Sequence, residues 1–415
     1  VFFYNGPDGS IYLVDYYREM IEHPEWASSN YHKDSEDLYR GTREGRIYKI
    51  YPQGKKPKSN LEKLSQESSH NLVSLLGHQN AWWRKTAQRL LVDRQAKEIQ
   101  PELVELLTSS PLPLARLHAL WTLEGLGLLA PEMVLTAFSD INPGVRENAV
   151  ILSELFLDES NEVHKTILGL ATDPSQRVRF QVLLTSGFLT SLEAQTIRDQ
   201  LLFEGIEDPW VPIAALSASS DEAPRLLELA ISHLAKKDSD GARLLFRMIG
   251  SVLGARQNKV EIVGLLTRIP RELSLDWWKS ELLKGLIRGT RVSASTLFSE
   301  KDVQKQILEI FMDASAGLRQ VALELVQLAG FPEDTHTSHL LKQAAMVAAN
   351  PNLEPKLRNE SIQLLGISKK TEYLSLFGEL IKPTVPESIQ VSAIQAIGLV
   401  GQEFNWRTLI LSWKS

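Results

Sequence analysis

Cysteine is absent from the 415 residues of this chain. Its absence excludes disulfides, thiolate metal sites and covalent attachment of haem c within these residues. No apolar run approaches the roughly 18–20 residues that a helix needs to span a bilayer, so the sequence predicts no transmembrane segment. The net charge is −6, whereas a general nucleic-acid surface is strongly basic. The sequence therefore predicts no nucleic-acid partner.

The two ends of the sequence leave the compartment open. The chain starts without Met inside a predicted strand, and it stops inside an amphipathic pattern that begins near Phe404. We expect both ends to be incomplete, so the lack of a recognisable signal peptide does not decide where the protein resides.

A short signature recurs along most of the chain. A turn containing Asn, Asp or Pro is followed by an arginine and then by an apolar helical pattern. The arginines of this row are Arg84, Arg116, Arg146, Arg179, Arg319 and Arg358. The first intervals are 116 − 84 = 32, 146 − 116 = 30 and 179 − 146 = 33 residues. A period in this range is typical of a solenoid, in which each unit buries its apolar face by stacking on the next.

The chain divides into two unequal regions. Residues 1–52 are predicted to be β, with strands at 10–17 and 45–51 and a polar excursion between them that is too long for a hairpin turn. Two or three strands do not form a stable sheet alone, so we expect them to belong to a larger β domain. Residues 53–60 have the composition of a linker. Residues 61–415 show paired amphipathic patterns that predict a mainly α solenoid of about ten helix pairs, incomplete at its C-terminal end.

The helical region, over roughly residues 61–403, resembles HEAT repeats. The resemblance is carried by the Asn/Asp-Pro turns and by the pairs Val145-Arg146 and Val178-Arg179. It implies that aspartates and arginines of successive repeats bond along the array. The candidates are Asp173, Asp208 and Asp313, with Arg146, Arg179 and Arg319. The arginine row is therefore interpreted as structural, and an exposed binding row is the alternative.

The N-terminal region resembles PVC-type membrane-bound dehydrogenase-like proteins. The match runs through Asp8-Gly-Ser-Ile-Tyr-Leu-Val-Asp-Tyr-Tyr-Arg-Glu-Met-Ile-Glu-His-Pro24 and Gly45-Arg-Ile-Tyr-Lys-Ile50, and continues at Trp82-Trp83-Arg84 and at 114–126. This resemblance implies the last strands of an incomplete β-propeller, similar to that of quinoprotein sugar dehydrogenases, followed by HEAT-like repeats. It implies an exported, periplasmic parent protein with a quinone cofactor and haem c. This chain lacks nearly all of the propeller and any Cys-x-x-Cys-His, so we expect no cofactor in it.

Four polar residues gather just past the end of a predicted strand. They are Asp15, Arg18, Glu22 and His23. Loops at strand ends often carry function; Arg18 can bind an anion bidentately, and His23 can act as a base near neutral pH. The alternative is that Asp15 and Arg18 bond the excursion to its own strand and that His23 begins a turn.

Two further sets of residues attract attention. His336 and His339 are spaced so that both imidazoles share a helical face, which suits a metal, but the sequence supplies no third ligand and an exposed helix start is favoured. Trp82-Trp83 and Trp277-Trp278 each begin an apolar helix. One ring of each pair is expected in the core, and the other is a candidate protein-binding anchor.

Taken alone, the sequence favours an interaction or structural scaffold from an exported quinoprotein-type dehydrogenase, with a protein partner or its own propeller bound to the solenoid. Two alternatives stay open: the loop at 15–23 forms part of a dehydrogenase active site, or the chain is a plain HEAT scaffold with no redox role. Whether this fragment is itself an enzyme is not decided, and we expect it to be inactive alone.

Overall fold

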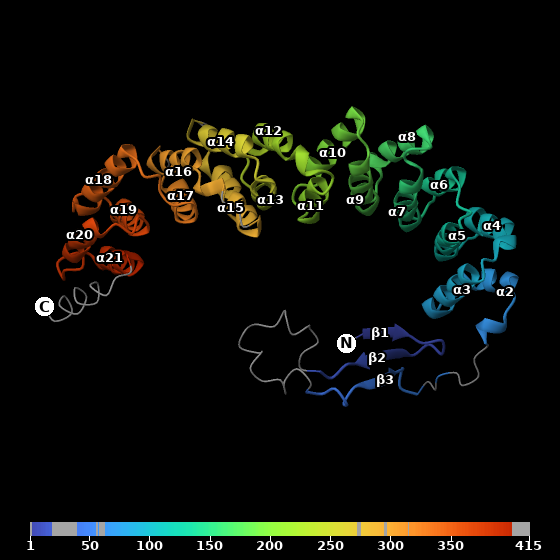
Figure 1. The fold of residues 1–415 in the computed structure, drawn as a ribbon. Helices are drawn as coiled ribbons and strands as arrows, with labels where there is room; N and C mark the ends of the chain where they lie inside the picture. Colours follow the sequence, from blue (N-terminus) through green and yellow to red (C-terminus); the bar gives the residue numbers. More distant parts are fainter. Residues whose placement is uncertain are drawn as a thin grey trace. The chain divides into compact units, whose positions relative to one another are not determined.

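The computed structural model describes residues 2–18, 40–54, 57, 63–271, 275–293, 297–313 and 315–400. The chain divides into two compact units, Val1–Thr185 and Ser186–Ser415, which are called unit 1 and unit 2 below. Figure 1 shows that helices prevail in both units and that the described strands all lie near the N-terminus.

Unit 1 begins with a three-stranded antiparallel sheet in the order β1–β2–β3. Its strands are β1 (Phe2–Asn5), β2 (Ile11–Asp15) and β3 (Arg46–Ile50). They are rich in aromatic and β-branched residues, which suit a pleated surface. The turn from β1 to β2 includes Gly9 with φ +81°, a conformation that strains other residues. The strands predicted at 10–17 and 45–51 are thereby confirmed.

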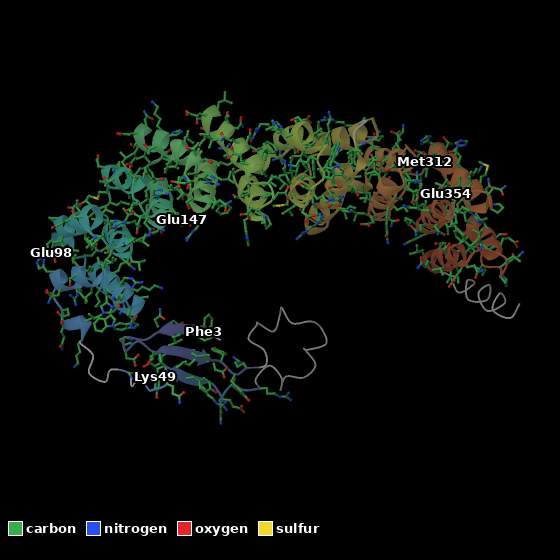
Figure 2. The ribbon with its side chains drawn as sticks, turned by 180° about the vertical axis from the view of Figure 1, so that it is seen from behind. Phe3, Lys49, Glu98, Glu147, Met312 and Glu354 are labelled. Atoms are coloured by element: carbon green, nitrogen blue, oxygen red, sulfur yellow. The ribbon has the colours of Figure 1, made fainter. Side chains whose placement is uncertain are left out.

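Both faces of this sheet carry apolar side chains. The strand register places Phe3, Leu13 and Tyr48 on one face, while Phe2 and Ile47 lie on the other. Phe2, Phe3 and Ile47 are 64%, 65% and 71% exposed, and Figure 2 shows side chains projecting from the sheet. A sheet with one buried face would alternate apolar and polar residues. This one has two apolar faces that the described residues leave largely uncovered.

The rest of unit 1 is a stack of helix pairs. The pairs are α2 (Ser69–Leu75) with α3 (Ala81–Asp93), α4 (Gln100–Ser109) with α5 (Pro113–Gly125), α6 (Pro131–Phe138) with α7 (Pro143–Leu152), and α8 (Asn161–Gly169) with α9 (Gln176–Thr185). First helices contact first helices of the next pair, and second helices contact second helices. The result is a first-helix row and a second-helix row, visible in Figure 1.

Unit 2 continues the same pattern. Its pairs are α10 (Leu192–Glu204) with α11 (Trp210–Leu216), α12 (Ala223–Leu234) with α13 (Asp240–Arg256), α14 (Lys259–Arg268) with α15 (Asp276–Ser293), α16 (Lys301–Asp313) with α17 (Ala316–Ala329), α18 (Thr335–Ala349) with α19 (Pro355–Ile367), and α20 (Leu374–Leu380) with α21 (Glu387–Val400). Each second helix from α11 to α21 contacts the next one. With four pairs in unit 1 and six in unit 2, the described residues contain ten, so the predicted mainly α solenoid is confirmed.

Local sequence explains where these helices begin and which faces they bury. Asn80 and Asn142 cap α3 and α7, because each side-chain oxygen accepts from the backbone N–H two residues on, at 2.9 Å. The predicted apolar face of α7 is buried, with Val145 and Ala149 at 1% and 0% exposure. Within the part of the chain that the structure describes, no helix combines the length and apolarity needed to cross a membrane.

In unit 2, two successive second helices approach closely enough for backbone contact. Gly250 and Gly254 of α13 face Gly285 and Gly289 of α15 across the contact. A Cβ atom on Gly285 would lie 1.9 Å from the carbonyl oxygen of Arg247, and one on Gly250 would lie 2.0 Å from that of Leu282. Real Cβ atoms do not approach so closely, so only glycine permits this packing.

Candidate functional site

The predicted arginine row of unit 1 is attached to its own turns by a regular bond. In each helix pair, a guanidinium Nη1 donates to the backbone carbonyl six residues earlier, in the turn before the second helix. The bonds are Arg84 to His78 at 2.6 Å, Arg116 to Ser110 at 2.7 Å, Arg146 to Asp140 at 2.7 Å, and Arg179 to Asp173 at 2.6 Å. These carbonyls precede the helices, so the bonds stabilise the turns that the repeat signature encodes.

Two of the arginines also bond to the following helix pair. Arg116 donates to both carboxylate oxygens of Asp140 at 2.6 Å, and Arg146 donates to those of Asp173 at 2.7 and 2.8 Å. The Asp140 and Asp173 side chains are only 7% and 3% exposed. Each is therefore a shielded, bidentate charge pair, which is the strong form of such a bond. Together, Arg116, Asp140, Arg146 and Asp173 are called the ladder below.

The ladder sets the charge of its two carboxylates. Burial alone raises the pKa of Asp140, but the hydrogen bonds from Arg116 and from the Asn142 N–H outweigh it and lower that pKa overall. Asp173 has a lowered pKa for the same reasons, with Arg146 and the Ser175 N–H as donors. Both groups are thus held ionised.

At Arg84 a histidine takes the place of the ladder carboxylate. The Arg84 Nε–H lies 3.3 Å from Nε2 of His118, whose Nδ1 is 2.7 Å from Oε1 of Gln88. Because the guanidinium can only donate, the imidazole must be neutral to accept. Burial, and then the charges of Arg84 and Lys85, lower the pKa of His118 to about 4.

In unit 2, two arginines of the row also make side-chain hydrogen bonds. Arg319 donates to Glu360 at 2.6 Å, and Arg358 donates to the carbonyl of Ala348 at 3.0 Å. The expected pairing of Asp208 with an arginine is wrong within the described residues, where the Asp208 carboxylate accepts from the Trp210 N–H at 3.0 Å. The Asp313 side chain lies outside the described residues.

Sequence reasoning missed several charged partners. Asp140 could have been found from its place in the turn, which is the same as that of Asp173. The side chain of each aspartate accepts a hydrogen bond from the backbone N–H two residues further on. Arg198 of α10 could not have been found from such a sequence pattern. It is 5% exposed and bonds the carbonyls of Ser186 and Leu189 and the Glu222 carboxylate. No motif marks a helix-interior arginine that reaches back to the preceding turn.

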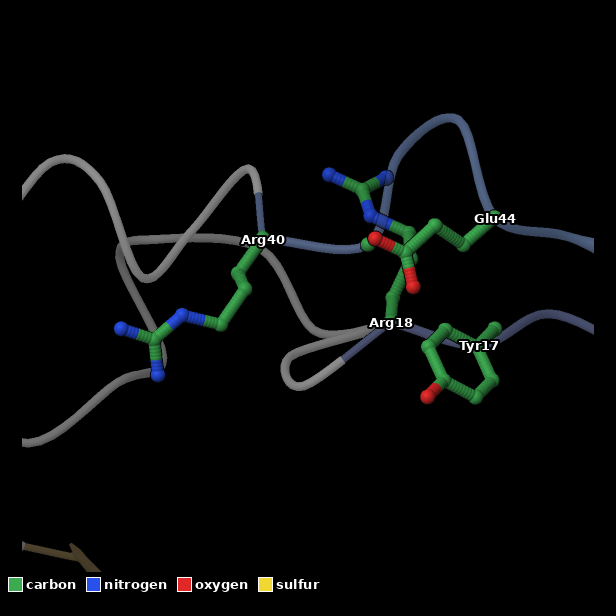
Figure 3. Close-up of a pocket in the computed structure, with 5 residues that line it drawn as sticks. Tyr17, Arg18, Arg40 and Glu44 are labelled. Atoms are coloured by element: carbon green, nitrogen blue, oxygen red, sulfur yellow. The ribbon is translucent and has the colours of Figure 1, made fainter.

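A small open pocket lies where β2 ends and β3 begins, and Arg18 is one of its lining residues. It has a volume of about 440 Å³ and is lined by Tyr17, Arg18, Arg40, Gly41 and Glu44. Figure 3 shows the side chains of Arg18 and Glu44 at this pocket, with the Arg40 side chain pointing away from them.

The other candidates of this loop add little to the pocket. Asp15 accepts from the Tyr17 N–H at 3.1 Å. Glu22 and His23 lie outside the described residues. Arg18 thus shares the lining of the pocket with Glu44, and any catalytic role for Asp15, Arg18, Glu22 and His23 stays a prediction.

The sheet is fixed to the first helix pair by two hydrogen bonds. The Nδ2 group of Asn80 donates to the Gly6 carbonyl at 2.8 Å, and the indole N–H of Trp83 donates to the Pro7 carbonyl at 2.8 Å. Trp83 is 8% exposed, whereas Trp82 is half-buried and meets it edge to face with ring centroids 5.5 Å apart. The first tryptophan pair thus builds a junction between the β1–β2 turn and α3.

The second tryptophan pair lies at the start of α15. Trp278 is 1% exposed, while Trp277 is half-buried and lies against the edge of Phe246, with ring centroids 5.5 Å apart. The Arg243 guanidinium sits 5.7 Å from the centroid of the Trp277 ring, within the range of a cation–π contact. Trp277 therefore borders a charged region of the second-helix row.

His336 and His339 are both exposed at the start of α18. Nε2 of His339 lies 3.1 Å from Nε2 of Gln343. Asp334 caps the helix through the Thr337 N–H at 2.7 Å. Across the described residues, no group of three or more His, Asp or Glu side chains is placed to hold a metal.

Comparisons with known proteins match the chain in two ways. A family described as a domain of unknown function (DUF7133) matches residues 1–54. A crystal structure of Kap121p bound to Pho4p is similar in fold, with 12% sequence identity and a TM-score of 0.51 over 82% of this chain and 42% of that one. A Kap121p mutant structure aligns at 14% identity and a TM-score of 0.47 over 81% and 42%. None of the curated proteins matches.

The chain therefore spans less than half of the length of Kap121p. At 12% identity the likeness concerns the fold, which is a helical-repeat solenoid of the HEAT type.

Proposed function

We propose that this chain is a scaffold that fixes a β domain at its first repeat and offers its helix rows to a protein partner. The observation that carries the proposal is the junction in unit 1. The side chains of Asn80 and Trp83 donate hydrogen bonds to the β1–β2 turn. Asn80 also caps α3, and the Trp83 ring is buried against the helices. A solenoid with no β domain to hold would have no use for these two bonds.

Support for a partner comes from the architecture of the stack. Each helix pair buries its core only against its neighbours, so both rows keep a long accessible surface. Kap121p, which has a similar fold, was crystallised bound to Pho4p, so a solenoid of this kind can hold a protein.

The finer proposal concerns the β domain. The apolar residues on both faces of the sheet favour a blade packed between others, as in a β-propeller. Combined with the sequence resemblance, this favours an exported, periplasmic parent related to quinoprotein dehydrogenases. In that parent the quinone cofactor and haem c would belong to parts of the protein outside this chain.

A second candidate function is catalytic: the loop after β2 would contribute residues to an oxidation site in the complete β domain. The pocket lined by Arg18 and Glu44 is the observation that favours it. An arginine there would bind an anionic group of a substrate or cofactor. This role needs the rest of the domain, because a propeller site is built from several blades.

One experiment separates these functions. The tagged chain is purified from its native source, co-purifying proteins are identified, and each candidate is made separately and titrated against the chain by calorimetry. We expect one purified partner to bind with defined stoichiometry. Dye-linked oxidation of sugars or alcohols by the chain alone, with added quinone cofactor and lost in Arg18→Ala, would overturn the scaffold proposal. A partner with no redox component would leave a plain scaffold.

A further inference from the structure

A buried carboxylate on α15 lies close to several lysine and arginine side chains of the second-helix row. The Glu281 side chain is 3% exposed and contacts Nη2 of Arg247 at 2.5 Å and Nζ of Lys284 at 2.8 Å, with Nη1 of Arg243 at 3.6 Å. Burial raises the pKa of Glu281, but the hydrogen bonds from Lys284 and Arg247 lower it overall. Glu281 is therefore a fixed negative charge beneath cations that remain 38–45% exposed.

Positive charge is in excess on this surface. Asp238 holds Arg243 bidentately at 2.6 Å, and the charge of Asp240 also acts on that arginine. Arg247 and Lys284 share the single carboxylate of Glu281. One helical turn beyond Lys284, Arg288 is exposed and has no carboxylate within ion-pair distance among the described residues. The cluster of Arg247, Lys284 and Arg288 against Glu281 thus leaves 3 − 1 = 2 positive charges.

Apolar side chains are exposed on the helix that precedes α13 in the second-helix row. On α11, which contacts α13, Trp210 and Ile213 are 65% and 42% exposed and stand on successive turns. Trp277 lies half-buried at the other side, against Arg243. Trp and Arg are the residue types enriched among those that contribute most to binding in protein interfaces. Trp210, Ile213, Arg247, Lys284 and Arg288 are called the basic patch below.

We propose that the basic patch binds an acidic amphipathic segment of a partner protein, with carboxylates on the cations and apolar side chains on Trp210 and Ile213. The proposal rests on the scaffold function above and names the chemistry of the partner. Charge complementarity selects the acidic partner, because the two excess charges are exposed and fixed on packed helices. The neighbouring tryptophan and isoleucine favour a peptide with apolar residues over a uniformly charged polymer.

The test uses the whole chain and a fluorescent peptide that carries Glu and Asp on one helical face and Leu on the other. Fluorescence anisotropy is followed while salt is raised. The variant is Lys284→Gln with Arg288→Gln, which keeps both Arg247 bonds to Glu281. Its matched control is Lys301→Gln with Lys305→Gln, which removes the same charge at the same spacing from exposed sites on α16 of the first-helix row. The single variant Arg288→Gln breaks no ion pair with a described residue and guards against misfolding.

We expect salt-sensitive binding that the patch variant weakens about tenfold or more, with a smaller loss in Arg288→Gln and none in the control. Equal loss in patch and control variants, or binding of a lysine-containing peptide of the same pattern, would overturn the proposal. So would a single-stranded oligonucleotide that binds the patch as tightly as the acidic peptide. If a purified partner binds the patch variant normally, this proposal fails while the scaffold function stands. If the peptide binds as expected and no partner exists, the scaffold function fails instead.

Discussion

Unit 1 and unit 2 stack helix pairs in the same way, yet individual joints between successive pairs differ in how they are built. In unit 1 the ladder of Arg116, Asp140, Arg146 and Asp173 crosses from one turn to the next through buried charges. In unit 2 the joint between α13 and α15 is backbone against backbone, with four glycines at the contact. A repeat can therefore keep its outline while adding a steric contact to its ion pairs, because Arg247 of α13 also pairs with the buried Glu281 of α15.

The two joints fail in different ways. A charged bond lost from the ladder leaves its buried partner uncompensated, whereas a side chain added to the glycine contact drives two helices apart. Four predictions test this contrast, and they run from the largest expected effect to the smallest.

The glycine contact is expected to be the most sensitive position. Gly285→Leu places a side chain where a Cβ atom alone would lie 1.9 Å from the Arg247 carbonyl oxygen, and we expect a loss of more than about 3 kcal/mol in unfolding free energy. The matched control is Gly264→Ala in α14, where no atom lies within 4 Å of the added Cβ and a gain of about 0.5–1 kcal/mol follows from helix propensity. Thermal melting by circular dichroism measures both. Equal melting of Gly285→Leu and wild type would mean that the contact is looser than described.

The ladder is expected to come next. Arg146→Ala leaves the Asp173 carboxylate 3% exposed and without its bidentate partner, which should cost about 3 kcal/mol. Arg177→Ala removes an arginine that is 74% exposed from its pair with Glu147, and the expected cost is about 0–1 kcal/mol. Melting gives the stabilities, and titration with a purified partner should show unchanged affinity in both variants. Unchanged melting with abolished binding in Arg146→Ala would mean that the arginine row is a recognition surface.

As the pH is lowered from 7, we expect the titration of His118 to be the first to reduce the unfolding free energy. Its pKa is lowered to about 4 from an ordinary 6.5, so the unfolded chain binds more protons between those values and stability falls as the pH drops through that window. Because the ring is partly exposed, we expect a loss of about 1–2 kcal/mol rather than the full value of the shift.

His118→Gln removes the titration while leaving an oxygen for Arg84, and denaturant unfolding between pH 7 and 4 would compare it with wild type. Below pH 3.8, the ordinary pKa of an aspartate, the unfolding free energy of both proteins should fall further as Asp140 and Asp173 become protonated. A wild-type curve that is flat from pH 7 to 4 would contradict the assignment.

The smallest effect concerns the attachment of the sheet. Trp83→Phe keeps a buried ring but removes the donor to the Pro7 carbonyl, and we expect about 1 kcal/mol of lost stability together with faster amide exchange in β1 and β2. Trp82→Phe keeps that bond and serves as the control. Exchange followed by mass spectrometry would decide, and equal protection in both variants would show that the junction does not hold the sheet.

The ladder shows which contacts a sequence can predict. A turn residue and an arginine repeat at nearly constant spacing, so the pairing of Arg146 with Asp173 could be anticipated from residues that lie close in sequence and recur. Asp140 was overlooked although it holds the N–H two residues on, as Asp173 does. An acidic residue three positions before the helix begins is the sequence signal that both turns share.

The glycine contact shows what a sequence conceals. By helix propensity alone, a glycine inside a helix is expected only to destabilise that helix. The spacing of Gly250 or Gly285 does not predict that the two helices will contact each other at these residues. That meeting depends on the register of α13 against α15, which is set by all the side chains packed around them. Charge clusters such as the one on Glu281 are hidden for the same reason, because their members come from different helices.

The ladder also gives unit 1 a direction of stiffness. Its ion pairs cross between helix pairs along the edge where the turns lie. Bending that spreads this edge must separate buried charges, whereas bending that closes it leaves them together. Under tension, unit 1 should therefore flex more readily in one direction than in the other. A load applied through the sheet would meet that preference from the second helix pair onward, where Arg116 lies.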